Sequence, residues 1–352
     1  MSLIEARTGL YVAAALAAAG AGATPANADA VADFYSGRQI TIEVGFGAGG
    51  GYDTTARIVA RHFGRHVPGK PAVIVQNAPG AGSMKVANSL YNSSPRDGSV
   101  LGVFSSSVGM VPLYGKRKVK FVTNRFEWIG SMHNDIQGCA VWKGAGQGIG
   151  TLPDFIAAKK TVIFGSNGPT SPLAIFPLFM RNVFNANVKV VNGYKGTKEV
   201  NLAMQKGEVS GTCGMYESTL TGAFYSSFKS GDLVMFVQFG LDRNVPLFGK
   251  ATNIFTLLKT EEERKMARLI FGPAEITRPL AAPPGTPKAR VAALRKALLD
   301  TMTDPALIAD AKKVRIAFNP MSGDDVARAF DEFFRTPKPI VDKTWDYITR
   351  TN

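Results

Sequence analysis

The sequence has few of the side chains on which most enzymes depend. Its 352 residues include only three histidines and two cysteines. It contains neither the Gly-x-Ser-x-Gly elbow of many hydrolases nor a phosphate-binding loop that ends in Gly-Lys-Ser/Thr. His62 and His66 could share a metal, but no glutamate accompanies them, so a surface pair is the better interpretation. We expect no catalytic residue, no metal and no other cofactor, and a secreted serine hydrolase is the alternative from another class.

A strongly apolar run long enough to cross a membrane is also missing. After Arg7 no charge occurs until Asp29, and residues 9–23 are mostly alanine with a few larger apolar side chains. Small residues at Ala-x-Ala spacing follow this stretch, which is typical of a secretory signal peptide rather than an uncleaved anchor. We expect residues 1–28 to be removed by cleavage after Ala28 or Ala30, leaving a soluble periplasmic protein.

Acidic residues are outnumbered, with 27 Asp and Glu against 41 Lys and Arg, for a formal net charge of +14. No run of five basic residues occurs, and the basic residues do not alternate with aromatic ones along a segment. We therefore predict no nucleic-acid partner, and the charge gives only weak support for an anionic small molecule.

Cys139 and Cys213 are the only cysteines. Export permits a disulfide between them. Two buried, unbonded side chains on neighbouring strands are the equal alternative, because the sequence does not reveal the separation of their Cα atoms.

The mature chain repeats a pattern of strand, polar or glycine-rich loop, and helix. Two such runs, each too small to be the whole protein, predict two α/β lobes. Ligands of such sheets bind beyond the carboxyl ends of the strands, at the helix starts. The expected strands are 38–45, 72–76, 100–104, 160–164, 188–191 and 233–239. The loops expected at the ligand are 46–53, 77–83, 105–107, 165–171 and 193–197.

The first of these loops contains Gly-x-Gly-x-x-Gly from Gly45 to Gly50, the spacing of a dinucleotide site. That site also needs an acidic residue some 20 positions later for the ribose, and none occurs between Asp53 and Asp97. We therefore reject a dinucleotide-binding site. The loop can still bind an anion, because glycines expose backbone N–H groups and a helix start adds partial positive charge. The loop therefore predicts an anion site.

Six short motifs, in order from about residue 36 to the C-terminus, resemble those of the tripartite tricarboxylate transporter receptors, the Bug family. They are Phe46-Gly-Ala-Gly-Gly50 with Asp53 and Ala56-Arg57, Gln76-Asn-Ala-Pro-Gly-Ala-Gly82, Pro95-Arg-Asp-Gly98, Phe164-Gly-Ser-Asn-Gly168 with Ser171, Gly193-Tyr-Lys-Gly196, and Ala282-Pro-Pro-Gly-Thr-Pro287. The chain departs from the family pattern at Ala48, Thr170, Leu173 and Gly193, where proline, glycine, histidine and proline are common.

The resemblance implies a type II periplasmic-binding fold of two lobes that close on a ligand, each a sheet flanked by helices. With it we expect the first lobe to comprise residues 31–132 and 241–352, and the second, inserted lobe residues 133–240. The ligand would be a small carboxylate (a di- or tricarboxylate or an aromatic acid), and the partners would be integral membrane transporter subunits that receive it from a monomer. An orphan sensor of the same fold that feeds a signalling kinase is the alternative.

Carried over by position, the implied contacts come from both lobes. The first-lobe contacts are Phe46, Ala48, Gly49, Tyr52, Asn77, Gly80, Ala81, Gly82 and Ser83, and Ser105 joins them as the first residue of its loop. The second-lobe contacts are Ser166, Thr170, Ser171, Tyr194, Gly196 and Thr197. We expect Asp53 to cap its helix, unless the ligand carries a positive group.

Overall fold

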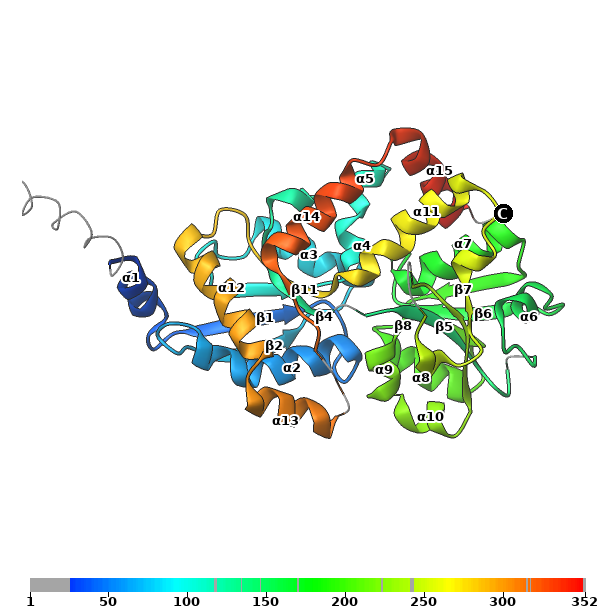
Figure 1. Cartoon of the computed structure of the whole chain (residues 1–352), viewed down its shortest axis with the longest axis horizontal. Coiled ribbons are helices and arrows are strands. Elements are labelled where there is room, and N and C mark those ends of the chain that lie inside the picture. Colours follow the sequence, from blue (N-terminus) through cyan, green and yellow to red (C-terminus); the bar gives the residue numbers. More distant parts are fainter. Residues whose placement is uncertain are drawn as a thin grey trace, which may run out of the picture.

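The computed structural model describes residues 26–116, 119–133, 135–145, 147–169, 171–222, 224–240, 244–314, 316 and 318–350. Two units lie side by side along the long axis of the molecule, and each is built on one six-stranded sheet (Figure 1).

The first sheet, at the left of Figure 1, has the strand order β12-β4-β11-β3-β1-β2. Its strands are β1 (Gln39–Val44), β2 (Ala72–Asn77), β3 (Val100–Val103), β4 (Glu127–His133), β11 (Thr277–Ala282) and β12 (Met321–Ser322). Around it lie α1 (Ala26–Tyr35), α2 (Gly51–Phe63), α3 (Met84–Asn92), α12 (Lys288–Met302), α13 (Pro305–Lys313) and α14 (Gly323–Phe334). The strand β1 runs parallel to both β2 and β3, so the loops after these strands meet at one edge of the sheet.

The second sheet has the order β10-β9-β5-β8-β6-β7. Its strands are β5 (Gln137–Trp142), β6 (Val162–Ser166), β7 (Val188–Asn192), β8 (Gly211–Tyr216), β9 (Leu233–Gln238) and β10 (Thr252–Asn253). Its helices are α6 (Leu152–Ile156), α7 (Pro172–Phe184), α8 (Thr197–Gln205), α9 (Glu217–Thr221) and α10 (Tyr225–Lys229). Because β10 pairs with β9, the return of the chain to the first unit comes after Asn253, which corrects the boundary that we expected at 240/241.

Four helices lie where the two units meet on the upper side of Figure 1: α4 (Ser106–Gly109), α5 (Val111–Tyr114), α11 (Glu261–Phe271) and α15 (Lys338–Thr349). The last helix, α15, packs on α7 of the second unit and on α5 of the first. The rings of Trp345 in α15 and Tyr114 in α5 have centroids 5.4 Å apart. Phe271 at the end of α11 stacks on Phe239, with centroids 4.2 Å apart. Apolar side chains therefore join the units along this edge.

The apolar periodicity of the sequence explains how α2 packs. Ala56, Val59, Ala60 and Phe63 recur at helical spacing along one face of α2, and all four are buried. The helix begins at Gly51, two residues earlier than the N-cap that we expected at Asp53. The strand β2 is largely apolar but lies at the edge of its sheet, so it is only partly buried.

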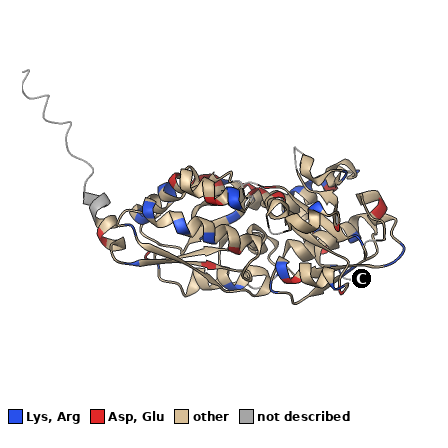
Figure 2. Cartoon of the chain, turned by 90° about the horizontal axis from the view of Figure 1, so that it is seen from below, with Lys and Arg blue, Asp and Glu red and all other residues tan. Residues whose placement is uncertain are grey.

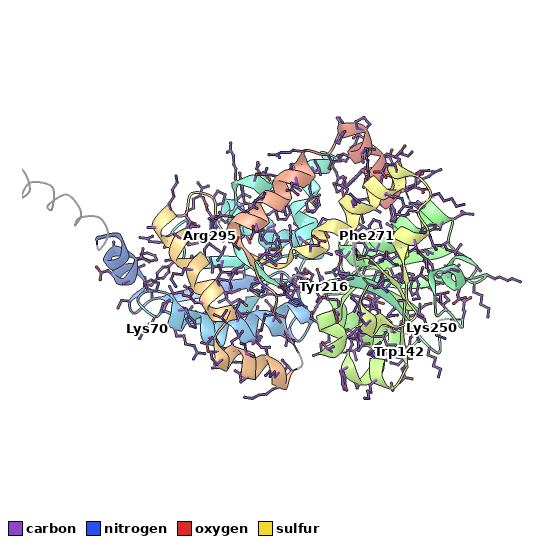
Figure 3. The ribbon with its side chains drawn as sticks, in the orientation of Figure 1. Lys70, Trp142, Tyr216, Lys250, Phe271 and Arg295 are labelled. Carbon is purple, nitrogen blue, oxygen red and sulfur yellow. A yellow bond between two sulfur atoms is a disulfide. The ribbon has the colours of Figure 1, made fainter. Side chains whose placement is uncertain are left out.

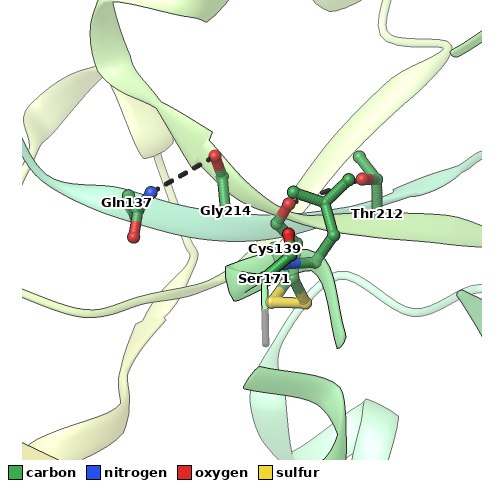
Figure 4. The surroundings of a disulfide bond; sticks show 7 residues. Gln137, Cys139, Ser171, Thr212 and Gly214 are labelled. Atoms are coloured by element: carbon green, nitrogen blue, oxygen red, sulfur yellow. Dashed lines mark hydrogen bonds between the residues drawn. A yellow bond between two sulfur atoms is a disulfide. The ribbon is translucent and has the colours of Figure 1, made fainter. Parts of the chain in front are cut away.

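A disulfide joins Cys139 of β5 to Cys213 of β8, which face each other in adjacent antiparallel strands. Of the two alternatives from the sequence, the structure therefore has the bonded one. Figure 4 shows the disulfide with Gln137, Ser171 and Gly214 around it. It links the two central strands of the second sheet.

Charged residues are distributed over both units, with Lys and Arg interspersed among Asp and Glu (Figure 2). Over the described ranges, no helix combines the length and apolar character required to span a membrane. Residues 1–25 of the predicted signal peptide lie outside the described residues. The two proposed cleavage positions fall within α1, and cleavage there stays a prediction.

Candidate functional site

A narrow cavity lies between the two units, and both contribute to its walls. The first unit supplies Phe46, Gly47, Tyr52 and other residues of the loop that leads into α2. The second unit supplies residues at the starts of α7, α8 and α9. Figure 3 shows Tyr216, one of the lining residues, where the units meet. The free volume is about 30 Å³, room for one or two water molecules, so the units are closed on each other.

Three helices of nine or more residues begin at this cavity. Gly50 and Gly51 at the start of α2 line it from the first unit. Ser171 caps α7 from the second unit, with its hydroxyl accepting a 3.2 Å hydrogen bond from the amide N–H of Leu173. Gly196 and Thr197 at the start of α8 complete the set. Helix starts carry partial positive charge and unpaired N–H groups, so their convergence favours an anion.

Asp53 fixes the loop before α2 and does not line the cavity. Its carboxylate accepts hydrogen bonds from the amide N–H of Gly49 at 2.8 Å, from Arg57 at 2.9 Å and from the side chain of Asn77 at 2.8 Å. Partial burial raises the pKa of Asp53, but these three hydrogen bonds outweigh it and hold the pKa below its usual value. Asp53, in the first turn of α2, therefore holds the loop before this helix in place.

The side chain of Asn77 belongs to the same network. Its amide nitrogen donates to the carbonyl oxygen of Phe46 at 3.0 Å as well as to Asp53, and its amide oxygen accepts from Arg57 at 2.7 Å. These partners occupy both donor hydrogens and the acceptor, so Asn77 shapes the loop instead of presenting a group to the cavity.

Two tyrosines, one from each unit, meet at the cavity wall. The hydroxyl oxygens of Tyr52 and Tyr216 are 3.3 Å apart and share a hydrogen bond. Burial raises the pKa of both phenols, and the nearby Arg278 opposes this rise. Both hydroxyl groups are therefore neutral at physiological pH and can donate to an oxygen of a ligand.

The charges at the cavity are few. Lys198 and Glu199, in the first turn of α8, are the charged lining residues among those described. Behind the wall formed by Gly51 and Thr219 lies the guanidinium group of Arg278. The buried carboxylate of Asp135 also acts on Tyr216, so charges of both signs surround the cavity.

The structure brings part of the predicted site together. Six predicted residues line the cavity: Phe46, Tyr52, Ser105, Ser171, Gly196 and Thr197. Nine predicted residues do not line it: Ala48, Gly49, Asn77, Gly80, Ala81, Gly82, Ser83, Ser166 and Tyr194. Thr170 lies outside the described residues. Ligand contact by any of these residues stays a proposal.

Several of the nine hold loops in place. The hydroxyl of Ser83 is buried and accepts from the amide N–H of Ser105 at 2.9 Å. The hydroxyl of Ser166, also buried, exchanges hydrogen bonds with the backbone of Gly168 within its own loop. Ala48, Gly49, Gly80 and Ala81 are exposed.

Other residues of the lining were not predicted from the sequence, among them Gln137, Asn167, Gly214, Tyr216 and Thr219. Gly214, Tyr216 and Thr219 lie at or after the carboxyl end of β8, a strand that the expected set omitted. Leu173, at the position where the family often has histidine, is buried and lines the cavity, so the wall there is apolar.

The histidine pair has acidic partners. His62 lies 3.0 Å from Asp310 and His66 lies 2.8 Å from Asp304, both of which belong to α13 and its cap. Over the described part of the chain, no group of three or more potential ligands is arranged to hold a metal.

Comparison with known proteins gives both sequence and structural relatives, although no protein-family model matches the chain. The "UPF0065 protein in gbd 5'region" of Cupriavidus necator is 38% identical over 101 residues, which is 29% of this chain and 29% of that relative's length. The periplasmic binding protein BugD has a TM-score of 0.70 at 18% identity, covering 88% of this chain and 99% of its own.

Two further solved structures contain bound acids. MatC from Rhodopseudomonas palustris with bound malate has a TM-score of 0.66 at 16% identity, covering 86% of this chain and 99% of its own. A second R. palustris protein, with adipate, has a TM-score of 0.67 at 16% identity. The match covers 88% of this chain and 97% of that protein's chain.

The chain has the fold of the periplasmic binding proteins, and the predicted two-lobed α/β architecture is confirmed. Its structural relatives include the Bug-type binding proteins, in agreement with the resemblance seen in its motifs.

Proposed function

We propose that this protein is a periplasmic receptor that captures a small carboxylate between its two lobes and converts nothing. The observation that supports this most directly is the convergence of the starts of α2, α7 and α8, from both units, on one cavity. Two similarly folded proteins contain malate and adipate, which are dicarboxylates. A ligand that contacts both lobes stabilises the closed arrangement, because only there are all its contacts made.

The further steps of the proposal follow from export and resemblance. The signal peptide is removed after Ala28 or Ala30, and the mature protein acts as a monomer in the periplasm. It delivers the acid to the membrane subunits of a tripartite tricarboxylate-type transporter.

Thr197, the first residue of α8, offers a test that separates ligand binding from stability. In Thr197→Asp a carboxylate lies at a helix start, where it stabilises the helix, but it also faces the cavity and repels an anion. Thr197→Asn is the matched neutral control. Titration calorimetry with malate, adipate, citrate and benzoate, with malamide as an uncharged probe, measures the affinities.

We expect wild type and Thr197→Asn to bind at least one of the four acids and not malamide. Thr197→Asp should bind that acid at least about tenfold more weakly, with a melting temperature of the ligand-free protein equal to or above that of wild type. Saturable binding of none of the acids, together with binding of a sugar or a cation, would overturn the proposal.

A further inference from the structure

Arg278 is a buried cation without a counter-ion among the described residues. Its side chain is 1% exposed. One nitrogen, Nη2, donates a 2.8 Å hydrogen bond to the hydroxyl of Ser218, while Nε and Nη1 have no hydrogen-bond partner. A guanidinium group removed from water in this way is unfavourable unless an anion compensates it.

Ser218 also contacts a buried acidic residue, Asp135, which is already engaged by other groups. Asp135 is buried and accepts hydrogen bonds from the amide N–H groups of Glu217 and Ser218, both at 3.1 Å. It also lies 3.6 Å from His133. Among the described residues, no carboxylate accepts a hydrogen bond from the guanidinium group of Arg278. The positive charge of Arg278 is therefore available to an external anion.

The guanidinium group lies directly behind the cavity wall. A Cβ atom on Gly51, a lining residue, would be 3.2 Å from Nη2 of Arg278, so the missing side chain opens the approach to this group. The guanidinium carbon is 5.8 Å from the ring centroid of Tyr52 and 5.1 Å from that of Tyr216. The two tyrosines thus cover the cation from opposite lobes.

The backbone of Arg278 is itself unusual. It has a φ of +57° within the strand β11, a conformation that non-glycine residues rarely adopt. Such conformations persist where the surrounding structure imposes them and are concentrated at binding sites. Here the strained residue is also the one with the unpaired buried charge.

We infer that Arg278 binds a carboxylate group of the captured solute and so determines the specificity of the protein for anions. This inference rests on the proposed function. The planar guanidinium fork matches the two oxygens of a carboxylate, and Nε and Nη1 are the donors that lack partners. Binding requires the hydrogen bond between Tyr52 and Tyr216 to open, after which both hydroxyl groups can donate to the same ligand. Because Tyr216 and Ser218 belong to the second lobe, the bound carboxylate would hold the lobes together.

A purely structural role, in which Arg278 only links the lobes through Ser218, gives a different set of results. Three variants separate the roles. Arg278→Met keeps the length of the side chain and removes the charge, and Arg278→Lys keeps the charge with fewer donors. Ser218→Ala removes the hydroxyl to which Arg278 donates its hydrogen bond. Each is titrated with malate, adipate and citrate by calorimetry, and its melting temperature is measured without ligand.

We expect the affinity of Arg278→Met for the acid that wild type binds to be lower by at least about 30-fold. Without ligand, this variant should melt at or above the wild-type temperature, because an uncompensated buried charge has been removed. Arg278→Lys should recover part of the affinity, and Ser218→Ala should stay within about threefold of wild type. Binding in Arg278→Met within about threefold of wild type, or an equal loss in Arg278→Lys and Arg278→Met, would overturn this inference alone. Failure of wild type to bind any of the acids would instead overturn the proposed function.

Discussion

The amide N–H of Gly82 in the first lobe donates a hydrogen bond to the carbonyl oxygen of Asn167 in the second, at 3.2 Å. The loops that carry these residues were predicted separately from their glycines, and the structure brings them into direct contact. At the same place Gly168 has no room for a side chain: a Cβ atom there would lie 2.7 Å from the backbone nitrogen of Gly82. Backbone-to-backbone contact thus defines the closed arrangement.

Gly168→Ala should therefore hold the lobes apart. We expect the affinity for the acid that wild type binds to fall at least about tenfold, since a backbone clash cannot be relieved by a side-chain movement. Because Gly168 has a φ of +158°, which alanine rarely adopts, the melting temperature of the ligand-free protein should also fall. Small-angle scattering should show no decrease in the radius of gyration on addition of acid. The control is Gly144→Ala, where the nearest atom to a new Cβ is 3.9 Å away. Normal closure of Gly168→Ala would contradict the contact.

Glu199 is the one acidic residue among the described lining of the cavity, and it stands at the start of α8. Glu199→Gln removes its repulsion of an anionic ligand while keeping its shape. Because the side chain is only partly buried, we expect a modest gain, about two- to fivefold in affinity for a dicarboxylate, measured by calorimetry at low and high salt. Weaker binding by Glu199→Gln would indicate that Glu199 holds a cationic group of the solute.

Asp53 gives a prediction for acid stability. Its pKa in the folded protein is lowered, so the ionised carboxylate stabilises the fold above the pKa of the unfolded chain, near 3.9, and this contribution is lost as the pH falls through the folded pKa. Asp53→Asn should melt below wild type at pH 6, and the difference should shrink as the pH drops below about 4. Asp346→Asn, at an exposed position, is the control. A difference in melting temperature that does not change with pH would refute this role.

The disulfide between Cys139 and Cys213 closes a loop with a sequence separation of 74. Its removal in the double variant Cys139→Ala/Cys213→Ala should lower the free energy of unfolding by about 2–4 kcal/mol. Affinity should change little, because the ladder between β5 and β8 remains. Denaturant titration with and without a reducing agent checks this. Equal stability of oxidised and reduced wild-type protein would show that the bond contributes nothing.

The sequence predicted the loops of the site better than its individual contacts. The strand-loop-helix pattern predicted the loops 46–53 and 193–197, because loops after parallel strands meet at one sheet edge. The family resemblance then singled out Phe46, Tyr52 and Thr197, which line the cavity. Asn77 ends β2 and Asp53 lies in the first turn of α2, and their side chains face each other and Arg57. The direction of a side chain depends on its tertiary neighbours. Sequence position alone therefore did not distinguish residues that hold the loop in place from residues that line the cavity.

Other parts of the site carried no readable local signal. Tyr216 is the last residue of β8, and the glycines and polar residues of this strand hide its strand character. Arg278 lies in β11, which pairs antiparallel with both neighbours and has no glycine-rich loop after it. The one available hint was a charged residue inside an otherwise uncharged strand, because such a residue is rarely buried without a partner.

The position of α15 predicts the side of the molecule from which a solute enters. The helix follows elements of the first lobe in the chain but packs on α7 of the second, and Trp345 meets Tyr114 across the junction. In Figure 1 this edge lies above the sheets, whereas α2, α8 and α9 lie below them. We expect the two lobes to open by a hinge motion about the edge at which α15 joins them. The widest gap would then form between Phe46 and Gly196, and an acid would arrive from the face remote from the C-terminal helix.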